Sequence, residues 1–589
     1  MMWMNARAAP MAACVWPTSA ARRHPQRSHV RCSSAPETPE ACPPRRSANY
    51  QPNSWDYDAL LSLKRSDHAL VSSSRYDKLR GSIKDLLLDN EASSSSSKLR
   101  LIDAMQRLGI SYRFEEEISG ILSCFSMEAD EVQNMDDVAS TALKFRLLRQ
   151  NGFLVTPEPL SGFNRKSYTT MLKKDASGLL SLHEASYLSF ENEEILDTAR
   201  TFSTNALKDL MPSMHPNIRN KLAHALDLPL HWRTPRLEAR WSIDHYCKDI
   251  SFDRLLLQFA VLDFNTVQCL NQEELANVTR WWKDVGLGEK LTFARDRLME
   301  CFHYANGIVW EPDHGACREM LAKICALIVH LDDVYDVYGS LDELELLTEV
   351  IERWDPSPSE LLPEYMQALY SVIYNVSNEV ADQALKEHGC SIHAFLGKAW
   401  YDLCTSFLME AKWHHGNYRP YLEEYLSNGW MSSSAPLLLL HAFPMLSSEI
   451  SAKTLDQIQS YPKLIQSASM IFRLCNDFVT HSEEMKRGDA PSFIAVHMYE
   501  KGANEQDSRE ALHNHLLDAW KKINEEAFKD CHFSRTFAKA CVNLARISHT
   551  VYQGGDGIGA PNMLQNKQIK DLFLAPILEE KDILDFDSI

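Results

Sequence analysis

Residues 331–338 read Leu-Asp-Asp-Val-Tyr-Asp-Val-Tyr and place three carboxylates at the end of an apolar segment. Apolar residues recur at helical spacing before this stretch, and Asp332 and Asp336 continue the same stripe. The apolar members are Leu321, Cys325, Ile328 and Val329. Two carboxylates one helical turn apart repel each other unless a cation lies between them, and Mg²⁺ prefers such hard oxygen ligands. The stretch therefore predicts a helix that ends in a metal site; a solvated acidic helix end is the alternative.

A second stretch, further along the chain, supplies a partner for the first. Residues 471–484 read Ile-Phe-Arg-Leu-Cys-Asn-Asp-Phe-Val-Thr-His-Ser-Glu-Glu. Asn476, Thr480 and Glu484 follow one another at intervals of four residues, so an amide, a hydroxyl and a carboxylate share one edge of a helix. Pro462 suits the first turn of that helix, because no N–H partner is needed there. Two oxygen-rich edges, each above an apolar wall, predict one shared metal site.

At these positions the chain resembles plant terpene synthases of class I, in the angiosperm monoterpene and isoprene synthase branch. Four motifs carry the resemblance, and they match at Arg45, Arg46 and Trp55; at Arg295 and Arg297; at Asp332, Asp333 and Asp336; and at Asn476, Asp477, Thr480 and Glu484. The resemblance covers essentially all of the chain after residue 44. It implies an all-α fold with two helical domains, an N-terminal α-barrel and a C-terminal class I terpenoid synthase bundle.

The resemblance also implies which metal ions and which substrate the two oxygen-rich edges bind. In the family, three Mg²⁺ ions join the protein to the diphosphate of a prenyl substrate, and Mn²⁺ is an alternative ion. The implied metal ligands are Asp332, Asp336, Asn476, Thr480 and Glu484, with Asp333 in a supporting role. Guanidinium groups are always charged and their forked donors fit phosphate oxygens, so Arg295, Arg297 and Arg473 are expected to bind the diphosphate.

Length and composition agree with a large protein of several domains. A chain of 589 residues is too long to fold around a single hydrophobic core. The net charge of -19 argues against nucleic-acid binding. The sequence contains no run of 18 apolar residues, so no membrane span is expected. The 14 cysteines show no CxxC pair or zinc spacing, which is typical of core thiols in a reducing compartment. A monomer or weak homodimer is expected.

Residues 1–44 differ in kind from the rest of the chain. Five arginines precede the first acid, Glu37, and Ala, Ser and Pro fill much of the remainder. An Arg-rich, acid-poor leader is typical of organelle transit peptides, so a plastid stroma address is expected, with an inert tail as the alternative. The expected division is then 1–44 transit peptide, 45–265 non-catalytic N-terminal helical barrel domain and 266–589 catalytic domain. The family resemblance further implies that the N-terminal strand with Arg45, Arg46 and Trp55 folds back and helps to cap the site; processing-site flanks are the alternative for the two arginines.

The N-terminal domain shows helical periodicity throughout, and nothing in it looks catalytic. The serine run 93–97 reads as a solvated loop between two helices. His183 beside Glu184 reads as a surface or core histidine, not as an acid/base pair. The DxDD signature of protonation-initiated cyclases is absent from the sequence. The catalytic domain is expected to begin with two helices over 255–264 and 273–282.

The expected chemistry is ionisation of an allylic diphosphate, followed by reaction of the carbocation in a dry pocket. Metal and arginine charges stabilise the leaving group, and aromatic faces stabilise the cation. The candidate aromatic walls are Phe302, Tyr304, Phe472 and Tyr552. The glycine-rich stretch 552–557 resembles the family's closing loop, with Asp556 taking part in closure. Residues 432–434 lie where the family breaks a pocket helix.

The predicted substrate is geranyl diphosphate, and the predicted product is an acyclic monoterpene: ocimene, myrcene or linalool. Isoprene synthases typically narrow the pocket with a Phe seven residues before the first aspartate, whereas this chain has Cys325 there. Asn306 is polar where the family is usually apolar, which raised the hypothesis that it positions a water for linalool formation. Phe472 and Ser432 match the residues that isoprene synthases typically carry at these positions, but Ser492 does not.

Several alternatives stay open on the sequence. Isoprene formation from dimethylallyl diphosphate is the first, and a cyclic monoterpene or farnesene synthase is the second. A chain-elongating prenyltransferase typically carries the aspartate-rich motif twice, once on each of two helices. The set Asn476, Thr480 and Glu484 does not match a second copy of that motif. A non-catalytic helical scaffold predicts at least one lost ligand or arginine, and none is lost.

Overall fold

The computed structural model describes residues 48–63, 73–89, 94–127, 138–164, 166–247, 252–357, 360–487, 492–528 and 532–577. All of these belong to one compact unit, Arg46–Ile589. The leader 1–44 and the pair Arg45 and Arg46 lie outside the described residues. Every regular element in the described ranges is helical, which confirms the all-α fold class.

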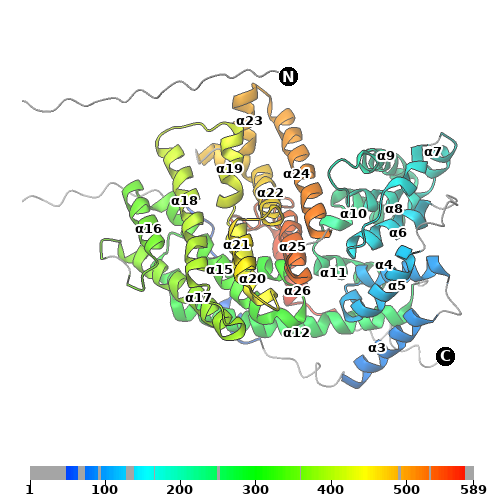
Figure 1. Cartoon of the computed structure of the whole chain (residues 1–589), viewed down its shortest axis with the longest axis horizontal. Helices are drawn as coiled ribbons and strands as arrows, with labels where there is room; N and C mark the ends of the chain where they lie inside the picture. The colour runs from blue at the N-terminus through cyan, green and yellow to red at the C-terminus, as the bar shows by residue number, and fades with distance from the viewer. Residues whose placement is uncertain are drawn as a thin grey trace, which may run out of the picture. The chain divides into compact units, whose positions relative to one another are not determined.

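The N-terminal helices are short and amphipathic, and they surround a core of leucine, isoleucine and phenylalanine side chains. They are α1 (Tyr57–Leu61), α3 (Ser73–Leu88), α4 (Ser95–Arg107), α5 (Glu115–Met127), α6 (Val138–Gln150), α7 (Lys166–Leu172), α8 (Ala176–Ser186), α9 (Glu194–Leu210), α10 (Pro216–Asp227) and α11 (Pro235–Tyr246) (Figure 1). His183 is buried on α8, where desolvation lowers its pKa to about 4, so the imidazole is a neutral core group.

The serine run was wrongly predicted as a loop. Ser94 is the N-cap of α4, and its hydroxyl accepts a hydrogen bond from the N–H of Ser97 at 3.2 Å. Ser95 begins the helix itself. Serine favours an N-cap because its side chain replaces a missing helical partner, so a polar serine run marks a helix start as readily as a loop.

Helix α12 (Arg254–Val285) replaces the two helices that were predicted over 255–264 and 273–282. No glycine or proline interrupts the intervening residues, so the helical hydrogen bonds continue without a break. Its first half meets the N-terminal helices, where Phe259 packs on Tyr76, and its second half meets α15 (Gly315–Asp333), where Trp282 packs on His330. Figure 1 shows α12 as a long helix whose N-terminal end reaches α3. The domain boundary at 265/266 falls inside this helix, and the division into two domains stays a prediction.

The remaining helices form the C-terminal bundle. They are α13 (Leu287–Lys290), α14 (Leu298–Ile308), α16 (Leu341–Arg353), α17 (Glu364–His388), α18 (His393–His415), α19 (Leu422–Ser432), α20 (Ala435–Leu446), α21 (Ala452–Gln459), α22 (Lys463–Arg487), α23 (Phe493–Lys501), α24 (Glu505–Phe528), α25 (Arg535–Val551) and α26 (Met563–Phe573). Helices α14, α15, α20, α22 and α25 pack on one another at the centre (Figure 1). Pro462 immediately precedes α22, one residue before the first turn in which it was predicted.

The packing of α14 on α25 depends on Gly307. A Cβ atom at this position would lie 2.4–2.5 Å from three side-chain atoms of Ile547, which is far inside van der Waals contact. The two helices therefore approach more closely than any larger residue at 307 permits.

Replacing Gly307 with alanine is expected to destabilise the protein by about 1–3 kcal/mol, because the added methyl group overpacks a buried helix contact. Gly120 on α5 is the matched control, since a Cβ there meets nothing within 4 Å. Gly120→Ala is expected to be neutral or to stabilise by about 0.5–1 kcal/mol. Thermal unfolding of both variants checks this, and equal effects would contradict it.

Candidate functional site

The aspartate-rich stretch ends α15 and opens a wider turn. Helix α15 stops at Asp333, and Val334–Tyr338 continue as a π-helical turn closed by a hydrogen bond from the Gly339 N–H to the Val334 carbonyl at 2.8 Å. Asp333 is fully buried, the Asp332 side chain is 31% exposed and Asp336 is exposed. The three carboxylates thus range from the core to the surface along one edge.

Arg295 is paired with this edge. Its Nη2 lies 2.6 Å from Asp332 Oδ2 and 2.8 Å from Asp333 Oδ1, and its main-chain N–H donates to Asp333 Oδ2 at 2.6 Å. Desolvation raises the pKa of Asp332 while Arg295 opposes that shift. The ring of Tyr50 lies 4.8 Å from the Arg295 guanidinium. The sequence analysis did not single out Tyr50, because no motif distinguishes it.

Helix α22 carries the second edge. Thr480 is buried and its hydroxyl donates to the Asn476 carbonyl at 3.0 Å, while Asn476 and Glu484 are partly exposed. Asp477 points the other way, into the core, where its Oδ2 accepts from the Tyr425 hydroxyl at 2.7 Å and the Phe493 N–H at 2.8 Å. Burial raises the pKa of Asp477 to about 6, against the effect of Arg473. Asp477 therefore fastens α22 to α19 and α23.

Arg473 lies on α22, one turn before Asn476, and its side chain joins α22 to α19. Its Nε donates to the Gly429 carbonyl at 3.0 Å, and its Nη2 donates to the Ser432 hydroxyl at 2.8 Å. Burial raises the pKa of Asp332, and the charge of Arg473 is one of the smaller effects that oppose this rise. Burial acts to lower the pKa of Arg473, but Tyr425 and the carboxylates around it, Glu484 among them, raise it. The two edges and the two arginines therefore share one electrostatic environment.

The helix break beside Arg473 is as predicted. Helix α19 ends at Ser432 and α20 begins at Ala435, with Ser434 in the left-handed region at φ 65°. Glu410 of α18 accepts the hydroxyl of Ser432 and lies 3.8 Å from Arg473. Sequence reasoning missed Glu410, because it lies in no motif and its partners are distant in the sequence.

Three of the four predicted aromatic walls form a continuous series. Phe472 contacts Tyr304 edge-on at 5.7 Å and Tyr552 edge-on at 5.6 Å. The Tyr304 hydroxyl bonds with Ser548 at 3.2 Å. Burial raises the pKa of Tyr552, and the nearby Asn476 side chain opposes that rise. The aromatic series therefore ends at the oxygen-rich edge of α22. Phe302 does not belong to it; its ring packs on Phe573 of α26 at 5.2 Å.

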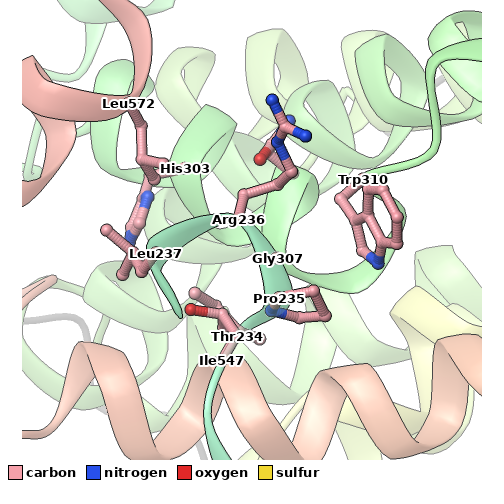
Figure 2. Close-up of a pocket in the computed structure, with 10 residues that line it drawn as sticks. Thr234, Pro235, Arg236, Leu237, His303, Gly307, Trp310, Ile547 and Leu572 are labelled. Atoms are coloured by element: carbon pink, nitrogen blue, oxygen red, sulfur yellow. The ribbon is translucent and has the colours of Figure 1, made fainter. Parts of the chain in front are cut away.

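The position of Asn306 does not support the hypothesis that this residue positions a reacting water. It lines a small cavity between α11, α14, α25 and α26, together with residues such as Pro235, His303 and Leu572 (Figure 2). None of the aromatic residues Tyr304, Phe472 and Tyr552 lines this cavity. The volume of the cavity is about 10 Å³, which is enough for about one water molecule. The periodicity of α14 carries Asn306 away from the face that bears Tyr304.

Arg297 points away from the carboxylates. Its Nε donates to the Ile558 carbonyl at 2.9 Å, and its Nη2 donates to the Gln51 carbonyl at 2.7 Å. The two arginines of the motif therefore face different groups, although only one residue separates them.

The donors of the two edges suit a hard divalent cation. Carboxylate, amide and hydroxyl oxygens are the ligands that Mg²⁺ prefers, and each edge leaves room for water or substrate oxygens. In the described part of the chain, no three His, Cys, Asp or Glu side chains converge on one point. None of the helices there has the length and apolar character that crossing a bilayer requires.

Comparison with known proteins agrees with this geometry. Residues 54–226 match the family model "Terpene synthase, N-terminal domain", and residues 283–522 match "Terpene synthase family, metal binding domain". A (-)-alpha-terpineol synthase of Vitis vinifera is 44% identical over 90% of this chain and 91% of its own length. A chloroplastic myrcene synthase of Quercus ilex is 42% identical over 91% of each chain. The crystal structure of isoprene synthase from Populus x canescens, in complex with three Mg²⁺ ions and dimethylallyl-S-thiolodiphosphate, superposes with a TM-score of 0.83 at 41% identity, over 89% of this chain and 99% of that one.

Proposed function

This chain belongs to the terpene synthase family, and we propose that it converts geranyl diphosphate into an acyclic ten-carbon terpene. As a member of the family it is a carbon–oxygen lyase that acts on a prenyl diphosphate. The observation that carries the proposal is that each oxygen-rich edge has its own arginine beside it: Arg295 is paired with Asp332 and Asp333, and Arg473 lies one turn before Asn476. Phe472, the centre of the aromatic series, is the neighbour of Arg473 on α22. Anion-binding charge thus adjoins an apolar, π-rich wall.

The metal ligands that we propose are Asp332 and Asp336 on one edge, and Asn476, Thr480 and Glu484 on the other. Bound Mg²⁺ or Mn²⁺ supplies positive charge that offsets the charge of the departing diphosphate. Arg295 and Arg473 add fixed charge from both sides of the same space. Asp333, fully buried and paired with Arg295, orients that arginine.

The aromatic series has the second task of protecting and stabilising the carbocation. The π faces of Tyr304, Phe472 and Tyr552 attract positive charge, and the burial of Tyr304 and Tyr552 keeps water away from it. Cys325 is 5% exposed. Burial raises the pKa of Tyr304, and the nearby Cys325 adds a smaller effect in the same direction. A small thiol at this wall supports a ten-carbon substrate over a five-carbon one. The myrcene synthase relative supports an acyclic product, whereas the terpineol synthase relative makes a cyclic alcohol the first alternative.

A substrate panel tests the proposal. The full chain, with Mg²⁺, is expected to release ten-carbon volatiles from geranyl diphosphate and little from the dimethylallyl or farnesyl compounds, as measured by gas chromatography–mass spectrometry. Isoprene from dimethylallyl diphosphate as the main product would overturn the assignment of the pocket size at Cys325. Mainly cyclic ten-carbon products would retain the substrate and overturn the acyclic outcome.

We also propose a plastid location, supported by the acid-poor leader and by the chloroplastic relative. A fluorescent fusion of the leader is expected to enter plastids. The oligomeric state, a monomer or weak homodimer, stays a prediction.

A further inference from the structure

We propose that Arg297 is a positioning residue that fastens two covers of the site, the N-terminal segment 48–57 and the late loop 552–561, to a single point. The proposal rests on the proposed function for the identity of the site that is covered. It assigns Arg297 a role apart from that of Arg295, in place of the diphosphate contact that the sequence motif predicted.

The contacts of Arg297 carry this inference. Its side chain is nearly fully buried, and its described hydrogen bonds all go to main-chain carbonyls. Besides its bonds to Ile558 and Gln51, Nη2 lies 3.3 Å from the Gly559 carbonyl and Nη1 lies 3.0 Å from that of Asp296. A planar fork of donors is suited to several acceptors at once. To bind diphosphate, this guanidinium would have to give up charge-assisted hydrogen bonds in a buried position, which leaves the carbonyls there without a donor.

The N-terminal segment is held by further side chains close to Arg297. Trp55 donates its indole N–H to Glu300 Oε1 at 2.8 Å, and the Tyr57 hydroxyl donates to Asp296. Tyr50 lies against Arg295. The segment is thus anchored along residues 295–300, and the Gln51 carbonyl is the point where it reaches Arg297.

The late loop is shaped to present its carbonyls to the same guanidinium. Asp556 Oδ1 accepts the N–H groups of Ile558 and Gly559 at 3.1 and 2.8 Å, which folds the loop back on itself. Gly557 is required in this turn, because a Cβ there would lie 2.4 Å from the Val551 carbonyl. The loop begins at Tyr552, whose ring packs edge-on against Phe472 of α22 at 5.6 Å. One side chain therefore joins both covers next to the diphosphate-binding arginine.

Hydrogen–deuterium exchange of the full chain tests the proposal. Arg297→Gln is expected to raise exchange in 48–57 and 552–561 together, by about tenfold or more, while α15 and α22 keep their protection. Inhibition by inorganic diphosphate with Mg²⁺ is expected to stay within about twofold of the parent, whereas Arg295→Gln weakens it by more than about tenfold. Arg240→Gln is the matched control, since Arg240 also donates to main-chain carbonyls, those of Asp571 and Ala575, and is expected to leave both covers unchanged.

The outcomes separate the alternatives. Loss of diphosphate inhibition in Arg297→Gln equal to that in Arg295→Gln would make Arg297 a diphosphate ligand and overturn the proposal. Increased exchange in only one cover would overturn the coupling. If the glutamine variant is too unstable to purify, Arg297→Lys, which keeps the charge but not the fork, is expected to give the same paired increase at smaller amplitude. Exchange needs no substrate, so a failure of the geranyl diphosphate assignment would appear only in the product assay.

Discussion

Replacing Asp332 with alanine is expected to reduce kcat by about 10³-fold or more, because the proposed site then loses a metal ligand at the point where both arginine charges act. Arg295 keeps its second carboxylate, Asp333, at 2.8 Å, so the fold loses only part of an ion pair. Steady-state kinetics with saturating Mg²⁺, and Mn²⁺ binding measured by electron paramagnetic resonance, check the two effects together.

The control for this variant is Asp342→Ala. Asp342 is an exposed acid in the first turn of α16 and takes no part in the site. It is expected to retain parental activity and Mn²⁺ binding. If Asp332→Ala retained turnover while still folded, the metal-dependent ionisation that we propose would be wrong.

Replacing Glu484 with glutamine is expected to lower kcat by roughly 10–100-fold and to raise the Mg²⁺ concentration needed for half-maximal activity by a similar factor. The substitution keeps the size of the side chain and removes the charge at the last position of the α22 edge. A titration of activity against Mg²⁺ separates weakened metal binding from a general loss of activity.

The neighbouring Glu483 offers a matched comparison. Its side chain is 63% exposed and pairs with Lys486 at 2.7 Å, on a different face of α22. Glu483→Gln is expected to leave the Mg²⁺ titration unchanged, because an exposed ion pair of this kind contributes about 1 kcal/mol or less. Equal effects of the two substitutions would mean that the α22 edge does not bind the metal.

Local patterns in the sequence predicted the helices that carry the site. Spacing of four residues placed Asn476, Thr480 and Glu484 on one helix, and α22 carries all three. Helical hydrogen bonds join residues four apart, so such an edge is determined within the helix itself. The same reasoning failed where local signals were ambiguous, as at Ser94, which caps a helix, and across residues 265–272, which continue α12.

Local patterns were equally unable to assign partners. Asn306 looked like a pocket residue because it is polar where the family is usually apolar, yet α14 turns it toward a separate cavity. Glu410 had no motif, yet it accepts the hydroxyl of Ser432 and lies beside Arg473. Both facts depend on which helix faces are packed against each other, which periodicity alone does not specify.

The sequence by itself thus determined the all-α fold class, the two oxygen-rich edges and the family to which the chain belongs, because these follow from residue type and short-range spacing. Only the tertiary structure decided how the two arginines of one motif divide their contacts. Arg295 meets carboxylates of α15, while Arg297 meets the carbonyls of Gln51 and Ile558, which lie about 250 residues away in either direction. Main-chain carbonyls carry no side-chain signature, so no motif reveals that they will be the partners of a buried guanidinium.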